Sequence, residues 1–263
     1  MSISTIPGRW QEEQLGAGAP AQSVPVSVRV VKRAIDLSFA AVGLVLLGLL
    51  FPFIALAICL DSPGPLFYRQ RRASFLKSCS ATGRCQFAAF DMLKFRTMRT
   101  DAEARTGAVL AGENDPRVTR VGRFLRRTRL DELPQFWNVL KGEMSLVGPR
   151  PERPELLENL TLAIPFFEER MRGCKPGITG VAQVSLTYSG GAPAGSRLRM
   201  IEESLVNPYG FEEARGALAD DMRTKLLFDL GYVASLERFS TFLMTELWVI
   251  VKTPLVMLRG LGR

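Results

Sequence analysis

Histidine is absent from this chain of 263 residues, and its absence removes whole classes of chemistry. Without an imidazole, the chain cannot build a Ser-His-Asp or Cys-His nucleophile, and it cannot bind zinc through histidine. Catalysis, if there is any, has to use carboxylates, Lys, Arg, Tyr, Cys or a metal ion held by oxygen atoms.

Cysteine is also scarce, with four residues at positions 59, 79, 85 and 174. Only Cys79 and Cys85 are close in sequence, and no CxxC pair is present, which argues against a zinc ribbon. We therefore expect four unpaired thiols in a cytosolic environment.

Acidic residues are in deficit, because 26 Asp and Glu face 34 Lys and Arg for a formal net charge of +8. A basic surface suits nucleic acids, anionic lipid headgroups or nucleotide substrates, but it also occurs on proteins that bind none of these. Aromatic residues are not interleaved with the arginines, so no nucleic-acid partner is expected. Residues 1–28 contain no apolar run and are predicted to be a flexible tail ahead of one functional domain, 29–263.

Charge is missing altogether from Leu37 to Leu60, a segment longer than the roughly 20 residues that span a bilayer core. Pro52 near its middle removes a helix hydrogen bond and bends the axis. Cations flank both ends, and cytoplasmic flanks are the ones that collect Lys and Arg; they are Arg29, Lys32 and Arg33 before, and Arg69, Arg71 and Arg72 after. We predict a re-entrant helix-break-helix over about 34–60 whose two ends stay in the cytoplasm. An ordinary kinked transmembrane helix is the alternative.

A second apolar stretch, Phe239–Leu258, carries Glu246 and Lys252 and is predicted to be an amphipathic helix on the membrane or in the core, with a second crossing as the alternative. Shorter patterns predict the other elements: a polar loop around Cys79 and Cys85, a strand over Phe87–Phe95, a loop over 100–115, a helix over 155–172 interrupted at Pro165, a short strand over Val181–Leu186, a loop over Ser189–Ser196 and a helix over Met222–Tyr232.

The stretch from Asn114 to Glu155 holds the candidate catalytic residues. An arginine-rich helix is expected from Arg117, and it runs into the adjacent carboxylates Asp131 and Glu132. Pro134 then begins a second helix that Gly142 ends. The two acids therefore lie at a helix start, where free N–H groups attract phosphate. The alternative is an ordinary helix cap.

Adjacent acids among cations near a membrane suit phosphoryl transfer. A carboxylate can attack phosphorus and form an acyl phosphate, which divides one displacement into two. Mg²⁺ held by one or two carboxylates would offset the phosphate charge, and arginines would hold the phosphate in bidentate fashion. Such a site could join a water-soluble phosphate donor to a lipid acceptor.

From about Arg29 to Leu258 the chain resembles the bacterial sugar transferases known as monotopic polyprenyl-phosphate hexose-1-phosphate transferases, or phosphoglycosyl transferases. The matching pieces occur in the family's order: KRAIDLSFAAVGLVLLGLLFPFIAL, SPGPLFYRQRR, KFRTM, NDPRVTRVGRFLRRTRLDELPQFWNVLKGEMSLVGPRPERP and KPGITGVAQV. Each piece alone is weak, whereas all five in this order are highly specific.

The resemblance implies a mainly α fold with a small β element, in which a re-entrant membrane helix and interfacial amphipathic helices surround a cytoplasmic active site. It implies transfer of a sugar-1-phosphate from a nucleoside diphosphate sugar, expected to be a UDP-sugar, to undecaprenyl phosphate in the bacterial inner membrane, with release of UMP. The reaction would begin an exopolysaccharide, capsule or O-antigen. A homodimer is left open, and the alternative is a scaffold without catalysis that docks a glycan assembly complex to the membrane.

The resemblance also assigns roles to residues. Asp131 would be the nucleophile that carries the sugar phosphate, and Glu132 would assist at a Mg²⁺ site formed with Asp131 or in proton handling. Arg126 and Arg150 would hold phosphate. Further residues of the substrate and phosphate pocket would be Lys94, Arg96, Gln70 and Arg72.

Three features depart from the family pattern. Phe51 precedes the helix-break Pro52 where serine is typical, Val181 replaces the usual tryptophan, and the insertion holding Cys79 and Cys85 is longer than usual. None of them alters the pair Asp131 and Glu132.

Overall fold

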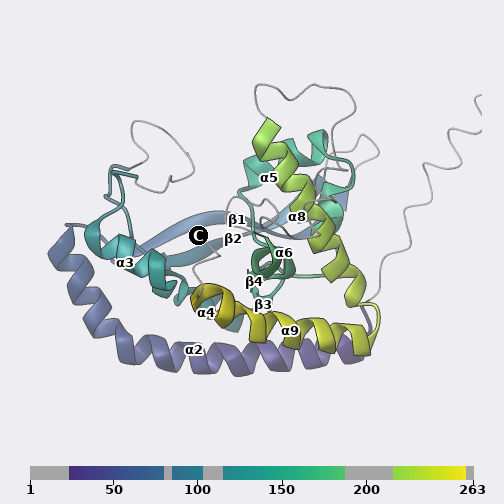
Figure 1. Cartoon of the computed structure of the whole chain (residues 1–263), viewed down its shortest axis with the longest axis horizontal. Coiled ribbons are helices and arrows are strands. Elements are labelled where there is room, and N and C mark those ends of the chain that lie inside the picture. The colour runs from purple at the N-terminus through teal and green to yellow at the C-terminus, as the bar shows by residue number, and fades with distance from the viewer. Residues whose placement is uncertain (1–23, 80–84, 103–114, 187–215, 259–263) are drawn as a thin grey trace, which may run out of the picture.

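The structure is a computed structural model that describes residues 24–79, 85–102, 115–186 and 216–258. Its elements are α2 (Val26–Asp61), β1 (Phe67–Cys79), β2 (Cys85–Phe95), α3 (Arg120–Thr128), η1 (Leu130–Glu132), α4 (Gln135–Lys141), β3 (Ser145–Val147), α5 (Pro154–Ala163), η2 (Phe167–Met171), β4 (Gly177–Thr179), α6 (Val181–Ser185), α8 (Gly216–Ser235) and α9 (Phe239–Leu258). Helices predominate around two small two-stranded sheets, so the predicted mainly α class is confirmed (Figure 1).

Helix α2 is one uninterrupted helix of 36 residues that contains Pro52. The predicted break at Pro52 is therefore not present as a gap in the helix, and the helix begins well before residue 34. A single proline removes one backbone hydrogen bond, which a long helix accommodates by bending. Figure 1 shows this response, because α2 runs along one side of the molecule and then bends upward toward its C-terminal end.

Both ends of α2 contact the same body of the protein. Near the start of the helix, the guanidinium of Arg33 donates hydrogen bonds of 2.7 and 2.8 Å to the carbonyls of Val139 and Leu140, which end α4. At the other end, the Asp61 carboxylate accepts a 2.8 Å hydrogen bond from the N–H of Val121 at the start of α3. Helix α2 is therefore fastened at both ends to the elements that flank Asp131 and Glu132.

Two helices, α2 and α9, are long and apolar enough to cross a membrane. Each also presents an exposed apolar surface, with Phe53 73% exposed on α2 and Met244 74% exposed on α9. Glu246 of α9 is nevertheless fully buried and accepts a 2.8 Å hydrogen bond from Lys32 of α2. Helix α9 therefore buries the Glu246 carboxylate against α2 while it exposes apolar side chains such as Met244.

Strands β1 and β2 form a long antiparallel hairpin that pairs Phe67 with Phe95 at one end and Cys79 with Cys85 at the other. The polar loop predicted around the two cysteines is wrong for the described residues, because both lie on the strands and only residues between them fall outside the described chain. Pairing with β2 makes this segment a strand although its sequence does not read as one. The pairing itself is irregular, with two register shifts after Ala73. The strand predicted over Phe87–Phe95 is confirmed.

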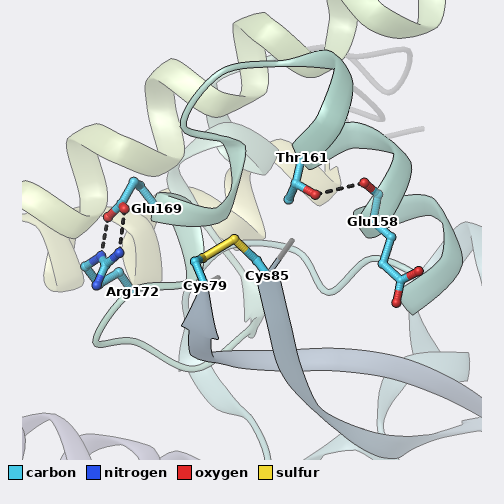
Figure 2. The surroundings of a disulfide bond; sticks show 6 residues. All are labelled: Cys79, Cys85, Glu158, Thr161, Glu169 and Arg172. Atoms are coloured by element: carbon cyan, nitrogen blue, oxygen red, sulfur yellow. Dashed lines mark hydrogen bonds and ion pairs between the residues drawn. A yellow bond between two sulfur atoms is a disulfide. The ribbon is translucent and has the colours of Figure 1, made fainter. Parts of the chain in front are cut away.

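Cys79 and Cys85 are joined by a disulfide (Figure 2). The prediction of four unpaired thiols is therefore wrong for this pair, because cross-strand pairing brings two residues separated by six positions to within 4.0 Å at Cα. Cys59 and Cys174 are free.

The second sheet is parallel and pairs β3 with β4. The backbones approach closely here, since a Cβ added to Gly177 would lie 2.2 Å from the nitrogen of Gly148. The strand predicted over Val181–Leu186 is wrong: the chain leaves β4 at Gly180 and forms the helix α6. Strand β3 is only three residues long, so the backbone beyond Thr179 has no further strand partner on β3 to hydrogen-bond with.

Several predicted helices are confirmed with adjusted bounds. The helix predicted over 155–172 appears as α5 followed by the 3-10 helix η2, and the one over Met222–Tyr232 lies within α8. The loop over Ser189–Ser196, residues 1–23 of the predicted tail and most of the loop over 100–115 lie outside the described residues.

Candidate active site

Asp131 and Glu132 lie on a tight turn between two helices. Arg129 ends α3 in the left-handed conformation with φ 59°, and the chain then forms the single 3-10 turn η1 that carries both acids. Pro134 lies at the N-cap position of α4, in keeping with the helix start predicted there. Both carboxylates are buried, at 7% and 8% exposure.

Three cations converge on Glu132 from three parts of the chain. Its Oε1 atom lies 3.2 Å from Nζ of Lys94, 3.8 Å from Arg129 and 3.7 Å from Arg150. Burial alone would raise the pKa of Glu132, but the charges of Lys94, Arg150 and Arg129 together lower it to about 2. The Glu132 carboxylate is therefore ionised at neutral pH and can accept hydrogen bonds from these cations.

Asp131 is in a different environment although it is the adjacent residue. Its Oδ1 atom is buried and has no hydrogen-bond partner among the described residues. Burial and the neighbouring charge of Glu132 raise the pKa of Asp131, with Lys94, Arg126 and Arg129 acting in the opposite sense. A buried carboxylate oxygen without a donor is destabilising by itself, so it marks a candidate position for a ligand or a reacting atom.

Arg126 reaches the site from the last turn of α3. Its Nε donates a 2.9 Å hydrogen bond to the hydroxyl of Thr97, which follows β2. The helix can come this close because Gly122 faces the strand end: a Cβ at position 122 would lie 2.1 Å from the carbonyl oxygen of Thr97. The close contact holds Arg126 near Asp131. The charge of Arg126 lowers the pKa of Asp131 and so opposes the overall rise.

Lys94 reaches the site from β2, and a residue that was not predicted aligns that strand with the η1 turn. The amide of Asn138, on α4, accepts a 3.0 Å hydrogen bond from the N–H of Leu93 and donates one of 2.9 Å to the carbonyl of Asp91. Asn138 is 1% exposed. No local pattern in the sequence singled out Asn138, because a polar residue within a helix usually faces solvent.

Arg150 projects from the GPRPER turn that follows β3. A second unpredicted group supports this turn: Arg170 of η2 donates a 3.1 Å hydrogen bond to the carbonyl of Arg150 and lies 3.9 Å from Glu152. Arg170 also pairs with Asp229 of α8 at 2.7 Å. Nothing local in the sequence pairs these residues, which are far apart along the chain.

Gln70 and Arg72 lie together beside the same turn. Two nitrogens of Arg72 donate to Oε1 of Gln70, and a third donates to the carbonyl of Pro151 at 3.0 Å. Burial, with the charges of Arg150 and Arg153, lowers the pKa of Arg72 to about 10 against the attraction of Glu152. The two predicted pocket residues are thus brought to the loop that carries Arg150.

Arg96 is directed elsewhere. Its guanidinium donates to Oγ of Ser62 at 2.6 Å and to the carbonyls of Ser62, Pro63 and Pro65 at 2.6–2.9 Å. It holds the SPGP turn that ends α2, whereas a phosphate-holding role was expected. The carbonyls of a proline-rich turn have few other donors, so a buried arginine satisfies them.

Comparison with known proteins identifies the family. The sequence profile of the family described as bacterial sugar transferase matches residues 27–260, and the chain belongs to this family. A UDP-N-acetylgalactosamine-undecaprenyl-phosphate N-acetylgalactosaminephosphotransferase of Aeromonas hydrophila is 35% identical over 95% of this chain and 48% of its own length. The exopolysaccharide production protein PSS of Rhizobium leguminosarum bv. phaseoli is 39% identical over 66% of this chain and 84% of its own length.

A UDP-glucose:undecaprenyl-phosphate glucose-1-phosphate transferase of Escherichia coli (strain K12) is 43% identical over 60% of this chain and 31% of its own length. The chain thus spans about half or less of the two relatives whose names state a reaction.

Proposed function

We propose that this protein transfers a sugar-1-phosphate from a UDP-sugar to undecaprenyl phosphate, forming undecaprenyl-diphosphate-sugar and UMP. The observation that carries the proposal is the contrast within one adjacent pair. Glu132 is surrounded by cations, whereas Asp131 keeps a buried oxygen without a donor. The family membership and the named relatives support the same reaction.

Asp131 is the proposed nucleophile. Its carboxylate oxygen attacks the phosphorus bonded to the sugar, the bond from that phosphorus to the bridging oxygen breaks, and UMP leaves with the bonding electrons. An oxygen of the lipid phosphate then attacks the same phosphorus, the acyl phosphate bond breaks, and Asp131 is restored as a carboxylate. The diphosphate lipid carries the sugar away.

Cations around the pair prepare it for this chemistry. Arg126 and Arg150 approach from α3 and from the GPRPER turn, and both can form paired hydrogen bonds with phosphate oxygens. Lys94 neutralises Glu132 and lowers the electrostatic cost of bringing a diphosphate beside two acids.

The residues fit a Mg²⁺ ion. The buried Oδ1 atom of Asp131 lacks a donor among the described residues, and Glu132 adds a second ionised carboxylate next to it. Oxygen ligands of this kind, completed by substrate phosphates, are those that Mg²⁺ takes in proteins. When bound, the ion would neutralise charge on the donor diphosphate.

We further propose that α2 is re-entrant, dipping into the cytoplasmic leaflet of the inner membrane. Its two ends contact the same body, through Arg33 at one end and Asp61 at the other. A helix of 36 residues is about 54 Å long, so a straight crossing would carry the ends to opposite sides. Exposed apolar residues such as Leu49 and Phe53 would then face lipid.

The topology has its own test. Single cysteines at Val30 and Ser62, in a chain whose other accessible thiols are replaced, are labelled on intact cells and on inverted membrane vesicles with a membrane-impermeant maleimide. We expect both positions to react only in inverted vesicles. Reaction of one position on intact cells would establish an ordinary crossing. Pro52→Leu, which removes the bend, is expected to expose one end.

The reaction is tested by release of UMP from purified protein given undecaprenyl phosphate, Mg²⁺ and a panel of UDP-sugars, with Asp131→Asn in parallel. We expect release that depends on the lipid, the metal and Asp131, and a sugar-phosphate adduct on the intact protein when the lipid is withheld. Full activity of Asp131→Asn would overturn the covalent route. Absence of release with every donor, alongside restored glycan synthesis by Asp131→Asn in cells, would establish the scaffold instead.

A further inference from the structure

The far end of the β1–β2 hairpin holds a second cluster of potential metal ligands. The Sγ atoms of Cys79 and Cys85 and a carboxylate oxygen of Glu168 all lie within 4.8 Å of one another. The thiols come from the paired ends of the two strands, and Glu168 comes from η2, which packs beside them. The three groups are partly accessible to solvent, so an ion could reach them.

The carboxylate of Glu168 is available, unlike its neighbour. Glu169 is bound by the guanidinium of Arg172 through two hydrogen bonds, as Figure 2 shows beside the disulfide. Among the described residues, Glu168 has no hydrogen bond or ion pair. An acid directed at two cysteines, with an adjacent acid already paired, has the arrangement of a ligand set.

The chemistry of these ligands selects the ion. Two thiolates and one carboxylate suit a borderline ion such as Zn²⁺ and not Mg²⁺, which prefers oxygen alone. Zinc binds sulfur at about 2.3 Å and carboxylate oxygen at about 2.1 Å in a tetrahedron, so its ligand atoms lie roughly 3.5–3.8 Å apart. After reduction the two bonded sulfur atoms separate to this spacing, and the Glu168 oxygen, already within 4.8 Å of both, moves closer by side-chain rotation.

We propose that, in its reduced form, this protein binds one Zn²⁺ ion through Cys79, Cys85 and Glu168, with water as the fourth ligand. The disulfide is the oxidised state of the same site. Two electrons and two protons from a dithiol reductant break the sulfur–sulfur bond and form two thiols, and Zn²⁺ then displaces both thiol protons. A cytosolic environment keeps such thiols reduced, so the zinc form is the one expected at the cytoplasmic face.

The ion would fasten η2 to the hairpin. That matters because η2 also carries Arg170, which donates to the carbonyl of Arg150. One short helix thus links the zinc ligand Glu168 to the turn that places Arg150 beside Glu132. The site stabilises the support of the active site from outside it.

The test uses the full-length protein, reduced with a dithiol and freed of metal, then titrated with Co²⁺ as a spectroscopic substitute for Zn²⁺. We expect a thiolate-to-cobalt charge-transfer band that saturates at one ion per chain and is displaced by Zn²⁺. The oxidised protein, whose disulfide is verified by mass spectrometry after alkylation, should show no band. A reduced protein without a band would overturn the proposal.

Variants separate this site from the other thiols and acids. Cys79→Ser and Cys85→Ser should lose the band, and Glu168→Gln should weaken binding by at least about tenfold. Cys59→Ser and Glu158→Gln, which alter an exposed thiol and a nearby exposed acid, should bind as the unmodified chain does. Equal affinity for Glu168→Gln, or an undiminished band after loss of either cysteine, would contradict the ligand set. Asp131→Asn should keep the band, so failure here is distinct from failure of the proposed reaction.

Discussion

The Nζ atom of Lys94 lies 3.2 Å from Oε1 of Glu132 and joins the end of strand β2 to the turn that carries Asp131 and Glu132. Both groups are largely buried, and burial lowers the pKa of Lys94 while Glu132 raises it. Lys94 needs a carboxylate partner at this depth, because an unpaired buried charge costs several kcal/mol, whereas Glu132 also has Arg129 and Arg150 nearby. The contact therefore sets the charge of the site and aligns two elements at once.

Replacement of Lys94 by methionine tests this relationship. Glu132 keeps Arg129 and Arg150 at 3.8 and 3.7 Å, so we expect a loss of about 1–3 kcal/mol in the free energy of unfolding, as for one lost charged hydrogen bond. The rate of UMP release should fall at least about tenfold, because a diphosphate then meets an acid pair with less neutralisation. Lys77→Met, an exposed lysine on β1, is the control and should leave both quantities unchanged.

Gly122→Ala should displace α3 from the end of strand β2. The added methyl would lie 2.1 Å from the carbonyl oxygen of Thr97, and backbone cannot yield as a flexible side chain does. We expect the free energy of unfolding to fall by about 1–3 kcal/mol. We also expect the contact between Arg126 and Thr97 to weaken, which should lower kcat for UMP release and leave the KM for undecaprenyl phosphate unchanged.

A glycine with open surroundings provides the matched control. A Cβ at Gly231 of α8 meets nothing within 4 Å, so Gly231→Ala should be neutral or stabilising by up to about 1 kcal/mol. Equal effects of the two substitutions would show that helix propensity, and not the contact with Thr97, governs position 122.

Asn138→Ala should loosen β2 from α4. It leaves the N–H of Leu93 and the carbonyl of Asp91 without their side-chain partners, and each buried polar group left unsatisfied costs about 1–3 kcal/mol. Urea unfolding of the purified protein measures the loss. Asn159→Ala, at an exposed position of α5, should change stability by less than about 0.5 kcal/mol.

The titration of Asp229 should contribute to the pH dependence of the free energy of unfolding. Burial raises the pKa of Asp229 to about 6, with Arg170 opposing the shift, whereas an unfolded aspartate has a pKa of roughly 3.9. The native protein therefore holds a proton in this window that the unfolded chain has lost. The sign follows: the free energy of unfolding falls as the pH rises from about 4 to about 6.

Asp229→Asn removes that contribution. Two pKa units correspond to about 3 kcal/mol. Between about pH 4 and pH 6, the fall in the free energy of unfolding should therefore be smaller in the variant than in the unmodified chain, by roughly 3 kcal/mol. Unfolding in detergent at several pH values measures it, and Asp91→Asn, an exposed acid on β2, should keep the original slope. Parallel slopes for Asp229→Asn and the unmodified chain would show that Asp229 does not titrate in this way.

Much of the site was predictable from local chemistry. The adjacency of Asp131 and Glu132, the helix start at Pro134 and the stop at Gly142 are properties of neighbouring residues, and the structure confirms the two helix boundaries. The motif order then identified the family. The local patterns missed strand β1, the disulfide and helix α6, which forms where a strand was predicted. Strand pairing depends on a distant partner that the local sequence does not identify.

The sequence by itself determined which residue types are present at the turn of Asp131 and Glu132, the lack of histidine chemistry and the existence of a long apolar helix. Only the tertiary structure decided which cations meet Glu132, that Arg96 holds a turn, and that Asn138 and Arg170 support the site. The physical reason is range. Helix propensity and capping act over a few residues, whereas a buried charge is satisfied by whichever distant group the packing brings within about 4 Å of it.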